Sequence, residues 1–140
     1  MLYARGDLRG AEAACRQLLQ LDPAHADALH ILGLVALRRG DRQQASDRIK
    51  EAIASNPNKP QPHNSLGVLL KEAGDVAGAE ASFRAAIGLK PDYPEALTNL
   101  GNVLCEGGAL ADAETMHRRV VELAADYAEG HNNLATALAR

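Results

Sequence analysis

The sequence contains few aromatic residues and few cysteines. It has no tryptophan, one phenylalanine and three tyrosines among its 140 residues, so no basic stripe interleaved with aromatic rings is available to bind nucleic acid. Its two cysteines, Cys15 and Cys105, lie far apart in the chain and show no CxxC spacing. The cysteine content therefore predicts neither a disulfide framework nor a zinc site, and it favours a reducing compartment.

The chain also lacks a large excess of charge and a long hydrophobic run. It carries 15 Lys and Arg against 18 Asp and Glu, a net charge of −3, which is a poor basis for binding a phosphate backbone through counterion release. No segment approaches the roughly 18 apolar residues of a membrane span, and the N-terminal segment shows no signal-peptide pattern. We therefore expect a soluble cytoplasmic protein with no nucleic-acid or membrane partner.

What the sequence does contain is a repeat with a period of 34 residues. Three prolines, Pro23, Pro57 and Pro91, recur at this spacing. A fixed period of this length indicates a solenoid of stacked helix pairs. Three further columns share the period: Gly6, Gly40, Gly74 and Gly108; Ala11, Ala45, Ala79 and Ala113; Leu32, Leu66, Leu100 and Leu134.

Each repeat has the pattern of two antiparallel helices. Val76, Ala79, Phe83 and Ile87 recur at three- and four-residue steps, which places an apolar stripe on one face of a helix. Gly-Asp pairs, such as Gly74-Asp75, end one helix and cap the next. We predict helices at 8–21, 27–39, 42–54, 61–73, 76–89, 95–107, 110–123 and 129–139.

These columns resemble the tetratricopeptide repeat (TPR) family, whose unit is two antiparallel helices. The middle unit matches the family motif at Leu66, Gly67, Leu70, Ala79, Phe83, Ala86 and Pro91. The resemblance implies an all-α solenoid, a right-handed superhelix of antiparallel helix pairs. Its units would be 1–25 (partial), 26–59, 60–93, 94–127 and 128–140 (partial, first helix only).

The sequence departs from the family motif at a few positions. Ala125 replaces the proline that ends the unit, and Ile49 and His117 replace an aromatic residue in the second helix. His63 and His131 stand where a large apolar residue is usual, and we expect them to be half-buried structural side chains.

In this family the first helix of each unit lines a concave groove, and the resemblance implies groove positions rich in amides. A carboxamide has donors and an acceptor, so it can pair with the N–H and C=O groups of an extended peptide. The predicted groove residues are His30, Arg38, Asn64, Lys71, Thr98, Asn99, Asn102, Asn132, Asn133 and Thr136.

Segments 98–104 and 132–138 are most similar to repeats of protein O-GlcNAc transferases, in which an asparagine ladder grips acceptor polypeptides. Here the ladder would consist of Asn99 and Asn133, because Ile31 and Ser65 occupy its earlier steps. Alternatively, these asparagines are tolerated polar residues on a solvated helix face.

Other reactive residues form no recognisable catalytic or metal-binding pattern. No histidine pair has the i, i+4 spacing of a zinc helix, and no nucleophile motif or phosphate-binding loop is present. We therefore expect no catalysis, cofactor or metal. Cys105 is interpreted as a small apolar filler rather than a reactive thiol, and Arg38, Arg39 and Arg42 as a solvated cluster at a helix end.

The leading functional hypothesis is a scaffold that binds an extended peptide segment of a partner protein in the groove. A second hypothesis is the substrate-recruiting arm of a larger glycosyltransferase-like enzyme. A third is a self-assembling scaffold. In that case helix 129–139 of one molecule would dock against residues 8–21 of another, head to tail.

Overall fold

The computed structural model describes residues 7–138, with side chains described up to residue 129. This part of the chain consists of seven α-helices and contains no strand: α1 (Leu8–Leu21), α2 (Ala26–Arg38), α3 (Arg42–Ser55), α4 (Pro60–Glu72), α5 (Val76–Leu89), α6 (Pro94–Glu106) and α7 (Leu110–Leu138). The bounds of the first six helices agree with the prediction to within one residue. None of the helices described has the length and apolar character needed to cross a bilayer.

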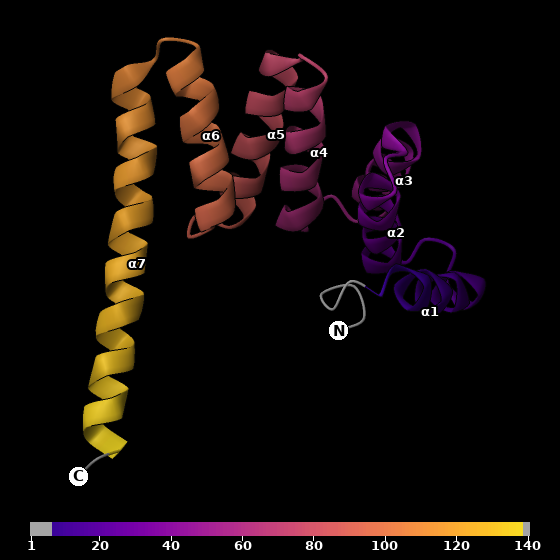
Figure 1. Ribbon diagram of the computed structural model, residues 1–140, viewed down its shortest axis with the longest axis horizontal. Helices are drawn as coiled ribbons and strands as arrows, with labels where there is room; N and C mark the ends of the chain where they lie inside the picture. Colours follow the sequence, from indigo (N-terminus) through magenta and orange to yellow (C-terminus); the bar gives the residue numbers. More distant parts are fainter. Residues whose placement is uncertain (1–6, 139–140) are drawn as a thin grey trace.

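The helices follow one another in space in the order of the sequence, as an elongated stack (Figure 1). The tightest pairs are α2 with α3, α4 with α5 and α6 with α7, and each pair contacts the next through α3–α4 and α5–α6. In addition, α4 contacts α6. The first helices of successive pairs therefore lie close enough for their side chains to interact.

The turns of the first two pairs are formed by the predicted Gly-Asp dipeptides Gly40-Asp41 and Gly74-Asp75, whereas the α6–α7 turn has Gly108 followed by Ala109. Gly40, Gly74 and Gly108 have φ values of 82°, 87° and 85°, a conformation that costs glycine little. The Asp41 and Asp75 side chains then accept hydrogen bonds from the backbone N–H groups of Gln44 (3.0 Å) and Gly78 (2.9 Å). Asp7 caps α1 in the same way, while Gly6 lies outside the described residues.

A second glycine column allows the two helices of each pair to approach closely. A Cβ atom on Gly67 would lie 2.5 Å from Cε1 of Phe83, and one on Gly33 would lie 2.7 Å from Cγ1 of Ile49. Phe83 and Ile49 are completely buried. The small residues of this column are therefore required by the packing.

The prediction of two separate helices at 110–123 and 129–139 is wrong. Residues 110–138 form one continuous helix, α7, which extends well past the other helices (Figure 1). The two preceding unit boundaries carry paired prolines, Pro57 with Pro60 and Pro91 with Pro94, and the first boundary carries Pro23 alone, whereas residues 125 and 128 are alanine. Because alanine has the highest helix propensity and keeps its N–H group, α7 continues across the predicted boundary between units at 127/128.

Candidate functional site

Polar side chains of the first helices join successive repeats along one face of the stack. Nε2 of His30, on α2, lies 2.8 Å from Oγ of Ser65 on α4. Nδ2 of Asn99, on α6, donates to Oδ1 of Asn64 on α4 at 3.0 Å. The two contacts are equivalent in the repeat, since in both the partners are 35 residues apart. We call these contacts the first and second polar joints.

The second polar joint lies in a cleft of about 530 Å³ lined by Asn64, Pro94, Glu95, Thr98 and Asn99. Three of the predicted groove residues, Asn64, Thr98 and Asn99, are thus brought together from two different helices. All three are half-buried. The carboxylate of Glu95 is exposed and adds a negative charge to the cleft.

Tyr93, at the N-terminal cap of α6, contacts the second polar joint through Asn64. Burial raises the pKa of its hydroxyl, the charge of Glu95 raises it further, and a hydrogen bond with the Asn64 side chain opposes the rise. Asn64 therefore interacts with both Tyr93 and Asn99. Because a carboxamide has two N–H groups and an acceptor oxygen, Asn99 keeps one N–H and its carbonyl oxygen for a further partner.

The first polar joint is half-buried like the second, but it contains a titratable group, His30. Burial lowers the pKa of His30 below its ordinary value of 6.5, and the charge of Asp27 opposes this effect. The imidazole is therefore mainly neutral at pH 7. No equivalent titratable group bonds across the second polar joint, where both partners are amides.

The remaining predicted groove residues have different environments. Nζ of Lys71 lies 3.4 Å from Oε1 of Glu106 on the next first helix. Arg38 and Asn102 are exposed. The predictions for Asn132, Asn133 and Thr136 fall outside the residues whose side chains are described.

The structure agrees with the interpretation of His63 and contradicts that of Cys105. His63 is half-buried and its Nε2 donates to the carbonyl oxygen of Pro57 at 2.9 Å, as expected of a structural histidine. Cys105 is exposed, so its interpretation as an apolar filler is wrong. The buried cysteine is Cys15, because it occupies the contact between α1 and α2 whereas Cys105 points away from the core of its pair. Among the described residues, no three side chains of metal-binding type gather in one place.

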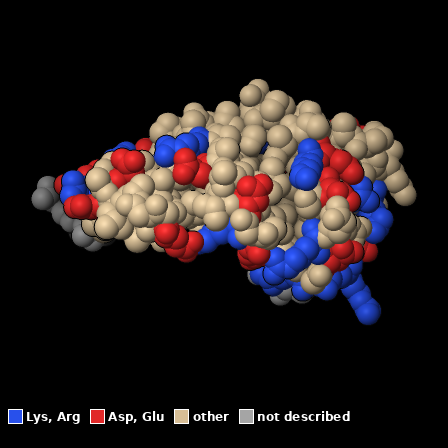
Figure 2. Space-filling model, turned by 90° about the horizontal axis from the view of Figure 1, so that it is seen from above, with Lys and Arg blue, Asp and Glu red and all other residues tan. Residues whose placement is uncertain are grey.

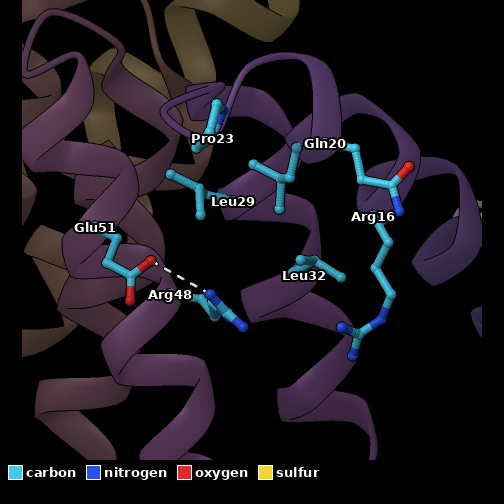
Figure 3. Close-up of a pocket in the computed structure, with 8 residues that line it drawn as sticks. Arg16, Gln20, Pro23, Leu29, Leu32, Arg48 and Glu51 are labelled. Carbon is cyan, nitrogen blue, oxygen red and sulfur yellow. Dashed lines mark hydrogen bonds and ion pairs between the residues drawn. The ribbon is translucent and has the colours of Figure 1, made fainter.

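Sequence reasoning missed a second cleft, of about 400 Å³, between α1, α2 and α3. Leu29 and Leu32 form its apolar wall, and Arg16 from α1 and Arg48 from α3 flank Leu32 (Figure 3). Arg48 lies 3.4 Å from Glu51. In the sequence, Arg16 is one of a column of basic residues on a helix face that is normally solvated, so no pattern distinguishes it. Only the packing of α1 and α3 against α2 brings the two arginines to one cleft.

Lys and Arg side chains are concentrated at the end of the molecule formed by α1–α3 (Figure 2). Residues 1–59 contain nine Lys and Arg and seven Asp and Glu, whereas residues 60–140 contain six and eleven. The amide-lined cleft therefore lies in the acidic half of the chain, and the cleft with two arginines lies in the basic half.

Comparison with known proteins agrees with this architecture. One tetratricopeptide repeat model matches residues 2–60 and 32–94, and a second matches residues 70–139. No curated protein sequence matches the chain. A crystal structure of MamA is similar in fold, with a TM-score of 0.79 and 23% identity over 91% of this chain and 75% of the MamA chain.

Two further solved structures are similar. Pseudomonas aeruginosa pilF has a TM-score of 0.78 and 25% identity, over 87% of this chain and 56% of that one. The Thermobaculum terrenum O-GlcNAc transferase has a TM-score of 0.69 and 33% identity, over 74% of this chain. The matched region is only 20% of the transferase chain.

Proposed function

Because the chain belongs to the tetratricopeptide repeat family, whose arrays are protein-interaction scaffolds, we propose that it holds an extended segment of a partner protein along α2, α4 and α6. The second polar joint is the centre of the proposed site. The activity proposed is binding, and the chain contributes no chemical step.

The observation that supports this proposal most directly is the hydrogen bond between Asn99 and Asn64. It holds the Asn99 carboxamide in one orientation within the cleft, so that less side-chain entropy is lost when a peptide binds. The remaining N–H and C=O of Asn99 match the alternating acceptors and donors of an extended backbone. Asn64 has a positioning role, and Asn99 makes the contact.

The same cleft indicates which segments it accepts. Amide contacts to a backbone select extended conformation and not side-chain identity. Glu95 adds a negative charge at the cleft, so segments with a Lys or Arg near the contacted residue are expected to bind more tightly.

The proposal is tested with a peptide selected from a random library on the wild-type protein. Asn99→Ala is expected to weaken binding of that peptide about fivefold, since a lost hydrogen bond costs on the order of 1 kcal/mol. Asn58→Ala, at an exposed asparagine in the turn before α4, is the matched control and leaves the affinity unchanged. Fluorescence anisotropy measures both variants, and thermal unfolding verifies that they are folded.

A second experiment tests whether Asn99 contacts the backbone of the peptide. N-methylation of one peptide bond in the selected peptide should reduce binding to the wild type and have little additional effect on Asn99→Ala. An unchanged affinity of Asn99→Ala for the unmodified peptide would refute the role of Asn99.

A second candidate function is the substrate-recruiting arm of a glycosyltransferase-like enzyme. The 33% identity to the TPR-containing transferase supports it. The genomic sequence on both sides of this segment distinguishes the two functions, because only the arm requires a transferase domain encoded in the same reading frame. The head-to-tail contact through residues 8–21 and 129–139 stays a prediction, and light scattering tests it below.

A further inference from the structure

One face of the last helix pair is exposed where the earlier pairs are covered. Ile53 and Ile87, near the ends of α3 and α5, are half-buried and pack against clusters that include residues of the following first helix. Val121 stands 34 residues after Ile87, in the same column, and is 68% exposed. The face of α6 and α7 around Val121 therefore lacks the helix that covers its equivalents.

Two tyrosines at equivalent positions of successive repeats differ in exposure in the same way. Tyr93 is 8% exposed and belongs to the cluster formed where α5 meets α6. Tyr127, 34 residues later, is 70% exposed. Both differences locate the uncovered surface at the point where a first helix would follow α7.

The chain contains the segment that corresponds to this missing cover. Residues 128–138 are in register with residues 94–104 of α6, and Leu134 is in the column of the buried Leu100. However, these residues continue α7 in a straight line away from α6 (Figure 1). The segment cannot reach the face around Val121 of its own chain while α7 is unbroken.

We propose that a second copy of this chain covers the face. Residues 129–138 of each copy lie along the α6–α7 face of the other, so that two α7 helices run antiparallel and the exchange is reciprocal. The contact has the geometry that α5 and α6, which are antiparallel and in contact, form within one chain. Exchange of an element that the fold already accommodates is a low-cost route to a closed dimer.

The unbroken α7 supports exchange between copies over the other arrangements. A fold-back within one chain requires a turn at residues 124–128, where Ala125 and Ala128 replace the prolines of the two preceding turns. A head-to-tail contact would leave the face around Val121 uncovered. Of these three arrangements, reciprocal exchange is the one that retains the straight helix and also covers this face.

The test compares two substitutions on α7 by multi-angle light scattering over a range of concentrations. The wild type is expected to have twice the 14.8 kDa mass of one chain. Val121→Glu should raise the Kd of the dimer at least tenfold. Leu110→Glu is the matched control, because Leu110 is 64% exposed on the same helix but lies outside the overlap of two antiparallel α7 helices. Both sites are exposed, so circular dichroism should show both variants folded.

A third variant tests whether the absence of the two prolines is what keeps α7 straight. Ala125→Pro with Ala128→Pro restores the proline pair, which should break α7 and let residues 129–138 cover their own chain. The expected product is a monomer whose maximum dimension in small-angle scattering is shorter than that of monomeric Val121→Glu.

Three results would overturn the proposal. The first is a wild type that is monomeric at every concentration, and the second is a dimer that Val121→Glu does not weaken. The third is a mass that grows beyond two copies with concentration, which would indicate head-to-tail assembly instead.

Discussion

Two segments related by the repeat, residues 88–94 and 122–128, have opposite structures. Their sequences, GLKPDYP and ELAADYA, share Asp-Tyr at the same positions. The first ends α5 at Leu89 and turns into α6 at Pro94, whereas the second lies inside α7. Two Pro-to-Ala differences therefore accompany the change from a turn to a straight helix.

The difference has a local and a tertiary cause. Proline inside a helix costs about 3 kcal/mol relative to alanine, so α5 cannot continue through Pro91. In addition, α6 is covered on both sides, by α5 and by α7, and buries Leu97, Leu100 and Val103. If residues 129–138 folded back, α7 would be their only cover among the described helices, so this segment would gain less from them than α6 gains from α5 and α7.

The largest effect is expected from removing the central residue of the middle pair. Phe83 is completely buried against Gly67, and Phe83→Ala should lower the free energy of unfolding by about 3–5 kcal/mol. The equivalent residue of the last pair, His117, is half-buried against Gly101, and His117→Ala should cost about 1 kcal/mol. Urea unfolding measures both. Equal losses would mean that the two pairs do not differ in packing.

A smaller effect is expected from making the α5–α6 turn resemble the segment in α7. Pro91→Ala with Pro94→Ala should lower the free energy of unfolding by about 1–2 kcal/mol, mainly through the greater entropy of the unfolded chain. The turn itself should persist, because α6 stays buried between α5 and α7. Hydrogen exchange of residues 90–95 is the measurement. Strong protection at these amides, as in a continuous helix, would show that proline alone forms the turn.

The two polar joints are expected to differ in their response to acid. Because the pKa of His30 is lowered on folding, the unfolded chain binds a proton more readily below about pH 6.5. Stability is therefore fully present above pH 6.5 and decreases as the pH falls through the pKa of the folded state. His30→Asn replaces the titratable group of the first joint with an amide like that of the second. Comparison of the thermal midpoint at pH 7.5 and pH 5.0 should show a smaller pH dependence in this variant, and an equal dependence would exclude His30 as its source.

The smallest effect is expected at ion pairs that both regions share. Arg84 pairs with Glu80 and Arg118 with Glu114, each at an i, i+4 spacing on an exposed helix face. Substitution of either arginine by alanine should lower the free energy of unfolding by about 0.3 kcal/mol. The loss should be the same for the two ion pairs. A much larger loss at either site, measured by urea unfolding, would indicate a contact beyond the intrahelical pair.

Much of the candidate site was predictable, but its hydrogen bonds were not. The resemblance to the tetratricopeptide repeat family implied that Asn64, Thr98 and Asn99 lie on the groove face of first helices, and the structure brings them to one cleft. The Asn64–Asn99 bond depends on the distance between α4 and α6, which is determined by how the intervening α5 packs. The cleft with Arg16 and Arg48 depends in the same way on how α1 and α3 pack against α2. Neither quantity is expressed in the spacing of residues along the chain.

By itself, the sequence determined the period, the first six helices and the turns within each pair, because glycine, aspartate and proline act on the backbone next to them. It also determined which faces are apolar, since a helix turns by a constant angle at each residue. The tertiary structure alone decided which amides bond to one another and which surfaces remain uncovered, and together with the local alanines it decided that residues 124–128 continue as a helix. These outcomes depend on the packing of helices distant in the sequence, and where that packing ends, as at α7, the local preference of alanine for a helix prevails.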